Sequence, residues 1–184
     1  MILVRHGQSK FNELFTKTRK DPGIEDPSIT SLGKEQIKGA TRILNGRRIT
    51  RLVSSPYRRA LETASIISNK LSLTISIDPL LREHFGFSCD IGSTRSHLIQ
   101  DWPGINFQHL EEKWWPEFKE REEEVESRSR LFLENTMALP DFDSVAAITH
   151  WGFIRSLTGM SVPNGTIVRV DKDGQGSIIE SIVR

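Results

Sequence analysis

The residues best suited to catalysis or ligand binding lie in the tripeptide Arg5-His6-Gly7, near the start of the chain. The glycine permits a tight turn that exposes the imidazole of His6. An imidazole titrates near neutral pH, so its neutral form offers a nucleophilic lone pair. Arg5 can donate two parallel hydrogen bonds to a phosphate or a carboxylate. The tripeptide alone is equally compatible with a surface turn that carries a solvated histidine.

Two later segments carry side chains of the same kinds. His150 follows the apolar run 145–149, and Arg59 follows the Ser-Ser-Pro turn at residues 54–56. Parallel strands of an α/β sheet end at one edge, and ligands bind beyond that edge. His6 also follows a short apolar run, so we expect these segments to converge. The pattern favours a site for a small anion, built from histidines and arginines.

Short apolar runs alternate with segments of helical spacing. Four runs are predicted strands, at residues 2–4, 49–54, 73–77 and 145–149. Helices are predicted at residues 30–45, 58–71, 95–101, 118–139 and 152–157. Asp173-Gly174 predicts a closing hairpin between residues 166–170 and 177–183, and the polar residues 16–29 are a predicted loop. The alternation predicts a three-layer α/β/α fold with a mainly parallel central sheet.

The composition restricts the class of protein. The 184 residues suffice for one domain over residues 1–184, in which residues 84–116 are expected to form an irregular excursion that caps the substrate. With 27% charged residues and a net charge of +1, the chain is not typical of a nucleic-acid binder. No apolar run approaches the ~20 residues that span a bilayer, and no signal peptide is visible. Together with a single cysteine, Cys89, these features predict a cytoplasmic protein without nucleic-acid or membrane partners.

Five ordered blocks of the sequence resemble the signature of the histidine phosphatase superfamily. This family includes cofactor-dependent phosphoglycerate mutases, fructose bisphosphatases and many acid phosphatases. The blocks are LVRHGQS followed by Asn12 (3–12), DPSIT followed by Gly33 and Gln36 (26–36), SSPYRRA followed by Thr63 and Ala64 (54–64), LRE (81–83), and TH followed by Gly152 and Ile154-Arg155 (149–155). The resemblance implies the phosphoglycerate mutase-like fold.

The resemblance also implies roles for the matching residues. His6 corresponds to the nucleophile that takes the phosphoryl group as a phosphohistidine, which water then hydrolyses. Arg5 and Arg59 correspond to the arginines that hold the phosphoryl oxygens, and His150 corresponds to a second histidine that donates to them. Because these groups supply positive charge, no metal and no other cofactor is expected.

The remaining candidates are less directly tied to the motifs. Glu83 matches the general acid that protonates the leaving oxygen, although the adjacent His84 could compete for that role. Asn12 matches a polar residue that often joins the pocket. Arg95 is a candidate for binding a second anionic group of the substrate, against the alternative of a surface salt bridge. Arg58, beside Arg59, is expected on a helix surface.

The sequence departs from the mutase branch in ways that favour hydrolysis. That branch has a lysine and paired arginines in this region, whereas residues 84–116 contain the single arginine Arg95 and no lysine before Lys113. The chain is also shorter than a typical mutase. Trp151 stands where many relatives have a small residue, and it either walls the pocket or packs against a loop. The predicted function is a metal-independent phosphomonoester hydrolase that acts on a small phosphorylated substrate. A cofactor-dependent phosphoglycerate mutase and a non-catalytic phosphate-binding module remain the alternatives.

Overall fold

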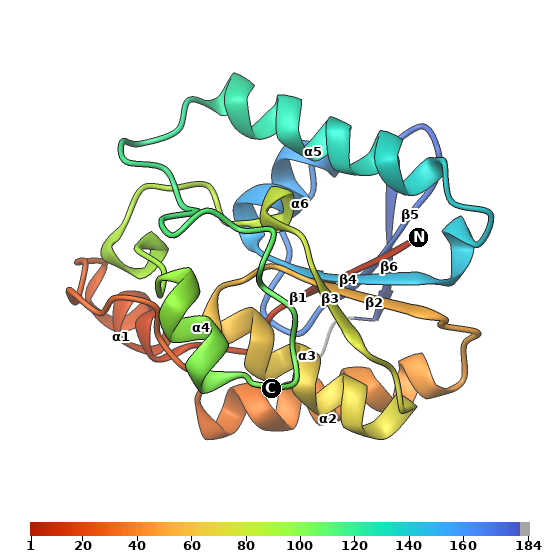
Figure 1. Ribbon diagram of the computed structural model, residues 1–184, viewed down its shortest axis with the longest axis horizontal. Helices are drawn as coiled ribbons and strands as arrows, with labels where there is room; N and C mark the ends of the chain where they lie inside the picture. Colours follow the sequence, from red (N-terminus) through yellow and green to blue (C-terminus); the bar gives the residue numbers. More distant parts are fainter. Residues whose placement is uncertain (181–184) are drawn as a thin grey trace.

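The computed structural model describes residues 1–180, which build a six-stranded sheet in the order β3-β2-β4-β1-β5-β6 (Figure 1). The first four strands in the chain are parallel: β1 (Ile2–Arg5), β2 (Arg51–Ser54), β3 (Ile75–Ile77) and β4 (Val145–Thr149). β5 (Ile167–Val170) pairs antiparallel with β1, and β6 (Gly176–Glu180) pairs antiparallel with β5 at the edge of the sheet. The predicted α/β fold with a mainly parallel sheet is confirmed.

Helices cover both faces of this sheet (Figure 1). One face is covered by α2 (Ser31–Asn45) and α3 (Arg58–Leu71), and the other by α5 (Glu122–Met137) and α6 (Trp151–Thr158). Each pair buries an apolar stripe against the sheet, so two hydrophobic layers hold the strands in place.

The central strand β4 shows why the sheet is predictable from the sequence. All five of its residues are buried. Val145 and Ala147 belong to the hydrophobic cluster under α5 and α6, whereas Ala146 and Ile148 belong to the cluster under α2 and α3. A strand with helices on both faces must be apolar on both sides, which produces a continuous apolar run.

The structure corrects two predicted boundaries. Residues 16–18 are not part of a loop, because they complete the helix α1 (Lys10–Thr18). This helix starts with a capping box, in which Ser9 and Asn12 satisfy each other's backbone N–H groups. The helix predicted from residue 118 starts instead at Glu122, and Phe118 is 76% exposed. Three consecutive glutamates in the first turn suit the positive end of the helix dipole, which accounts for the later start.

Residues 84–116 pack as an irregular layer with one short helix, α4 (Arg95–Asp101). Three short 3₁₀ helices complete the description: η1 (Pro79–Leu81), η2 (Ser88–Asp90) and η3 (Phe142–Ser144). The predicted closing hairpin is present as β5 and β6, but residues 181–183 of the prediction lie outside the described residues. Within residues 1–180 none of the helices has the length and apolar character needed to cross a membrane.

Aromatic residues fix the excursion to the main body. Trp114 is 8% exposed and packs edge-on against Tyr57, with ring centroids 4.7 Å apart. Its indole N–H donates to the Ser93 carbonyl at 2.8 Å. Phe107 and Leu110 are buried in the same cluster. Trp114 therefore packs the excursion against α3 and its preceding turn.

Candidate active site

The carboxyl ends of β1, β2 and β4 bring the predicted segments together. Because β4 lies between β1 and β2 in parallel orientation, all three strands end at the same edge of the sheet. The backbone N–H of His6 donates to the Thr149 carbonyl at 3.0 Å. The rings of His6 and His150 are 5.0 Å apart between centroids. The two histidines that the sequence placed 144 positions apart are neighbours.

A close backbone contact shapes the turn after β1. A Cβ atom on Gly7 would lie 2.5 Å from the Gly33 carbonyl oxygen, and one on Gly33 would collide with the Gln8 carbonyl. Any side chain at either position would therefore force the turn and the start of α2 apart. This contact explains why glycine follows His6 and why another glycine stands at the start of α2.

His6 is held as a neutral base. Its side chain is buried, with the residue 2% exposed, and its Nδ1 lies 2.8 Å from the Gly7 carbonyl oxygen. A carbonyl can only accept, so Nδ1 bears the hydrogen and Nε2 keeps its lone pair. Burial, followed by the charges of Arg59 and Arg5, holds the pKa of His6 well below its usual value. At neutral pH the imidazole is therefore unprotonated and nucleophilic at Nε2.

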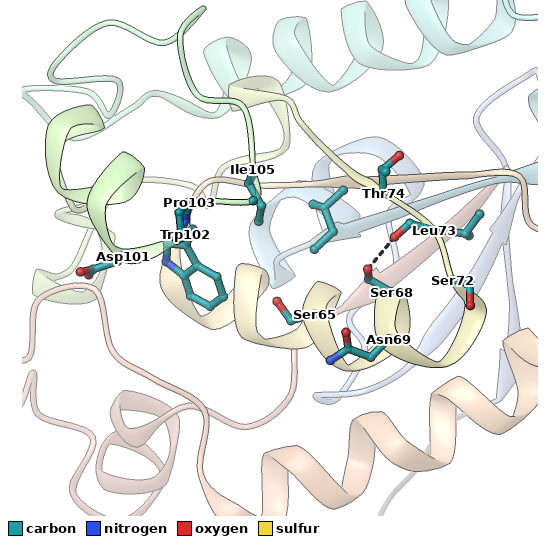
Figure 2. Close-up of a pocket in the computed structure, with 12 residues that line it drawn as sticks. Ser65, Ser68, Asn69, Ser72, Leu73, Thr74, Asp101, Trp102, Pro103 and Ile105 are labelled. Carbon is teal, nitrogen blue, oxygen red and sulfur yellow. Dashed lines mark hydrogen bonds between the residues drawn. The ribbon is translucent and has the colours of Figure 1, made fainter.

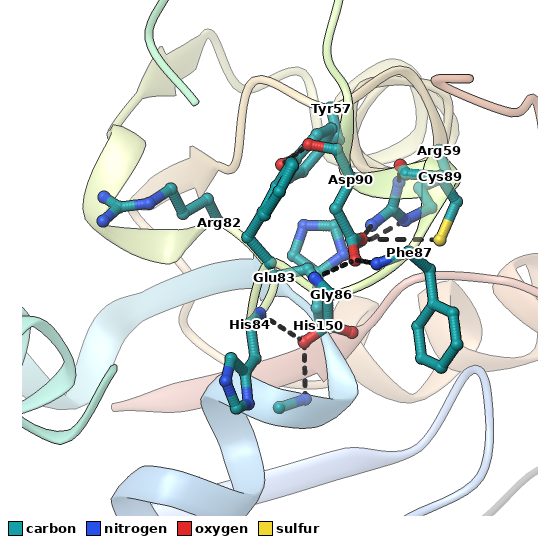
Figure 3. A network of polar contacts seen from close by, with 12 residues as sticks. Tyr57, Arg59, Arg82, Glu83, His84, Gly86, Phe87, Cys89, Asp90 and His150 are labelled. Atoms are coloured by element: carbon teal, nitrogen blue, oxygen red, sulfur yellow. Dashed lines mark hydrogen bonds and ion pairs between the residues drawn. The ribbon is translucent and has the colours of Figure 1, made fainter. Parts of the chain in front are cut away.

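Arg59 lies in the first turn of α3 and points into the cluster (Figure 3). Its guanidinium group donates from Nη1 to the Cys89 carbonyl at 2.6 Å and from Nη2 to Asp90 Oδ1 at 3.1 Å. Its Nε donates to Nδ1 of His150 at 3.3 Å. These bonds use three of five N–H groups, so two remain for a bound anion.

His150 is buried beside Arg59, and both of its ring nitrogens have protein partners. Nδ1 accepts the Arg59 hydrogen bond, so the neutral ring has its hydrogen on Nε2 and donates it to Ser55 Oγ at 2.8 Å. Burial and then the charge of Arg59 keep the pKa of His150 well below its usual value. The structure brings His150 to the cluster, but directs its N–H to Ser55.

Arg5 is the second cation beside the histidines. Its Nη1 donates to the Val162 carbonyl at 2.6 Å, while its Nε is buried and has no hydrogen-bond partner within the described chain. Burial lowers the pKa of Arg5 to about 10, which still leaves the group charged at neutral pH. A buried charged donor without a partner is costly, so it fits an anion that binds at this place.

Glu83 reaches the same site from the segment after η1. Its Oε1 accepts hydrogen bonds from the backbone N–H of Gly152 at 2.6 Å and of His84 at 2.9 Å (Figure 3). Oε2 makes no hydrogen bond within residues 1–180, so this oxygen can bear a proton. Burial, followed by the negative charge of Asp90, raises the pKa of Glu83. A Cβ atom on residue 152 would lie 2.5 Å from Oε1, so only glycine admits the carboxyl group here.

Two candidates near the cluster already have structural partners. Asn12 Oδ1 accepts from Ser9 in the capping box of α1 and from Asn164 Nδ2 at 3.2 Å. Asn164 Nδ2 also contacts the carbonyl of His6 at 3.1 Å, so Asn12 lies at the edge of the site. His84, the competing acid, directs its Nε2 toward the Glu120 carbonyl at 2.8 Å. Glu83 therefore has the better geometry for proton transfer.

The other candidates make contacts outside the cluster. Arg95 donates to the Leu110 carbonyl at 3.1 Å and pairs with Glu112 at 3.5 Å, which corresponds to the surface salt bridge. No contact joins Arg95 to the histidine cluster among the described residues. Arg58 pairs with Glu62 on the exposed side of α3 as expected.

Trp151 packs on the outer side of the loop after α6. Its indole N–H donates to Ser161 Oγ at 2.9 Å. The Arg155 guanidinium lies 5.2 Å from the centre of its ring. Of the two roles open from the sequence, these contacts support packing against a loop.

Several polar residues of the site were not assigned a role from the sequence. Asp90 is 1% exposed, pairs with Arg59, and accepts from the backbone N–H groups of Gly86 and Phe87 at 3.1 Å. Ser55 belongs to a recognised block, but nothing in the block indicates that its hydroxyl accepts from His150. For Asp90, the sequence offered only an acidic residue next to Cys89, without an assigned role.

A separate groove of about 630 Å³ opens between α3, β3 and residues 101–105 (Figure 2). Ser65, Asn69, Asp101 and Trp102 are among the side chains that line it. None of its lining residues belongs to the histidine cluster. The histidines and arginines described above are therefore gathered at the strand ends and not in this groove.

The sequence is similar to that of known phosphatases over most of its length. The family model of the histidine phosphatase superfamily (branch 1) matches residues 1–173. A glucosyl-3-phosphoglycerate phosphatase of Mycolicibacterium vanbaalenii is 30% identical over 182 residues, which cover 91% of this chain and 78% of that protein. Its counterpart in Mycobacterium tuberculosis is 29% identical over 168 residues, with 86% and 73% covered.

The structural comparison gives the same fold. The mycobacterial glucosyl-3-phosphoglycerate phosphatase in complex with VO3 superimposes with a TM-score of 0.67 at 23% identity, covering 98% of this chain and 97% of that chain. The resemblance seen in the sequence motifs, and with it the prediction of a histidine-type phosphatase, is confirmed. The chain belongs to branch 1 of the histidine phosphatase superfamily.

Proposed function

We propose that this protein hydrolyses phosphomonoesters without a metal ion, through a phosphohistidine on His6. In the first step Nε2 of His6 bonds to phosphorus while the bond to the leaving oxygen breaks. That oxygen keeps the electron pair and takes the proton of Glu83. In the second step water attacks phosphorus, the Glu83 carboxylate takes its proton, and the N–P electron pair returns to His6.

One observation supports this proposal above the others. The lone pair of neutral His6 lies beside two buried guanidinium groups that retain unused N–H donors. Phosphoryl transfer depends mostly on positioning and on stabilising negative charge, which guanidinium groups can provide without a metal. On phosphate binding, the N–H of His150 would leave Ser55 and donate to a phosphoryl oxygen.

Residues 84–116 are the proposed cap over the substrate. They supply two of the three partners of Arg59, the Cys89 carbonyl and the Asp90 carboxylate, so the excursion is part of the wall of the site. The relatives named above act on glucosyl-3-phosphoglycerate, which places a small phosphorylated metabolite among the substrates to test. Because Arg95 pairs with Glu112, we do not assign it to a second anionic group.

The test is a phosphate-release screen over sugar phosphates, phosphoglycerate, glucosyl-3-phosphoglycerate, nucleotides, phosphopeptides and polyphosphate, with and without EDTA. Release that EDTA does not affect supports the proposal. Rapid isomerisation of phosphoglycerate in the presence of bisphosphoglycerate would indicate a mutase instead. Tight binding of a phosphorylated compound with no turnover would indicate a non-catalytic module.

The pH profile of kcat/KM should be bell-shaped. His6 must be unprotonated, so activity rises as the pH rises through its lowered pKa, which lies well below the usual 6.5. Glu83 must be protonated, so activity falls as the pH rises through its raised pKa, above the usual 4.5. A bound phosphate anion raises the pKa of Glu83 further, so the basic limb of kcat should lie at higher pH than that of kcat/KM. A profile that stays flat from acid to alkaline pH would contradict both assignments.

A further inference from the structure

Arg128, a buried arginine on α5, donates hydrogen bonds from its guanidinium group to the chain segment that bears Glu83. Nη1 of Arg128 donates to the carbonyls of Leu80 and Arg82, both at 2.8 Å. Its Nη2 donates to the carbonyl of Glu83 itself at 3.0 Å. The arginine side chain is only 5% exposed. Three backbone carbonyls around the candidate general acid thus share a single guanidinium group.

Glu120 completes this arrangement. Its carboxylate accepts the two remaining N–H groups of Arg128, from Nε at 2.9 Å and from Nη2 at 3.0 Å. The same carboxylate accepts from Arg82 Nη2 at 2.6 Å and from the backbone N–H of Phe85 at 3.1 Å. The Glu120 carbonyl lies 2.8 Å from Nε2 of His84. The chain is therefore held on both sides of Glu83.

The Arg128–Glu120 network holds the main chain of Glu83, and α6 holds its side chain. The main chain of Glu83 is tied to α5 through Arg128, and its carboxyl group is tied to the N–H of Gly152 at the start of α6. We propose that Glu120 and Arg128 are positioning residues that fix Glu83 for proton transfer to the leaving oxygen. This inference rests on the proposed role of Glu83 as general acid.

The hydrogen bonds of Arg128 and Glu120 fix the local geometry more tightly than the stability of the fold requires. Buried ion pairs are often no more stabilising than apolar side chains of similar volume. A planar group with five donors, however, fixes three carbonyls and a carboxylate in one geometry, which an apolar core cannot do. Misplacing a catalytic group by about 1 Å can lower a rate roughly 100-fold. Loss of the Arg128–Glu120 network should therefore displace Glu83 before it unfolds the protein.

The test compares two substrates that differ in their need for an acid. An alkyl phosphate needs protonation of its leaving oxygen, whereas p-nitrophenyl phosphate releases a stable anion that does not. Lysine at position 128 keeps the charge but cannot hold three carbonyls. Because hydrolysis of the phosphoenzyme is common to both substrates, the comparison uses kcat/KM, which reports departure of the leaving group. We expect Arg128→Lys to lower kcat/KM for the alkyl phosphate roughly 10- to 100-fold and for p-nitrophenyl phosphate by about threefold at most. Arg130→Lys is the matched control, since Arg130 lies exposed on the same helix and pairs with Glu126, and it should change neither rate.

Equal losses on both substrates would overturn the inference, because a merely structural role does not distinguish leaving groups. Glu83→Gln is measured in parallel to separate this inference from the proposed function. If Glu83→Gln does not discriminate between the substrates, the role of Glu83 as general acid fails. If Glu83→Gln discriminates and Arg128→Lys does not, only the positioning role fails. Should Arg128→Lys lose its native circular dichroism spectrum, Glu120→Gln replaces it, with Glu126→Gln as its control and the same two outcomes deciding.

Discussion

Replacement of His6 by alanine should lower kcat for phosphate release by at least ~10⁴-fold, the order of loss seen when an enzyme loses its nucleophile. No other imidazole of the cluster can substitute for it. Nδ1 of His150 accepts from Arg59, and its Nε2 bears the hydrogen, whether it donates to Ser55 or to a phosphoryl oxygen, so neither nitrogen offers a free lone pair. The measurement is steady-state phosphate release together with trapping of the phosphoenzyme in alkaline denaturant, because the P–N bond of a phosphohistidine is hydrolysed in acid. The phosphoenzyme should form in the wild type and be absent in His6→Ala.

The matched control is His97→Ala, because His97 is an exposed histidine on α4. It should retain both the wild-type rate and the trapped phosphoenzyme. A His6→Ala protein that releases phosphate at the wild-type rate would rule out the phosphohistidine mechanism. Phosphoenzyme that persists in His6→Ala would place the covalent bond on another residue.

The second large effect is expected for Glu83→Gln, which should lower kcat for an alkyl phosphate roughly 10²- to 10⁴-fold. Glutamine has the same shape, and its carbonyl oxygen can still accept from the backbone N–H groups of Gly152 and His84. What it lacks is a proton that titrates in the working range. The basic limb of the pH profile should therefore disappear along with the rate.

Two further variants make this result decisive. Glu111→Gln changes an exposed glutamate in the same chemical way and should leave the rate unchanged. His84→Gln tests the competing acid, whose ring faces the Glu120 carbonyl. If His84→Gln abolished the basic limb while Glu83→Gln kept it, His84 and not Glu83 would be the general acid.

The elements that the sequence predicted well are those in which local and tertiary preferences agree. The helices Arg58–Leu71 and Arg95–Asp101 have the predicted bounds, because an apolar stripe and clear boundary residues coincide in each. The helix α1 was missed because it is mostly polar, with a single buried residue, Phe11. Its capping box was the one local signal. The helix predicted from Phe118 is present as α5, but its start was wrong because a spacing of seven residues does not by itself locate an end.

The residues of the candidate site also divide into those that the sequence could identify and those that it could not. His6, Arg59 and His150 could be placed because they lie in ordered motifs that follow predicted strands. Glu83 could be singled out among the 24 acidic residues only through the resemblance to the family. The roles of Asp90 and Arg128 could not, since their partners are brought to them only by the folded chain. Arg128 contacts carbonyls more than 40 positions earlier in the sequence, and backbone carbonyls leave no trace in residue types.

The unpartnered Nε of Arg5 implies a conflict between folding and function. A buried donor that finds no acceptor among residues 1–180 destabilises the native state, commonly by about 1–3 kcal/mol. An apolar side chain of similar size at this position would remove that penalty and strengthen the fold, yet it would abolish the charge that faces the substrate. Under the proposed function, the protein accepts a less stable native state in exchange for a preorganised anion site, and binding of phosphate should raise its stability against unfolding.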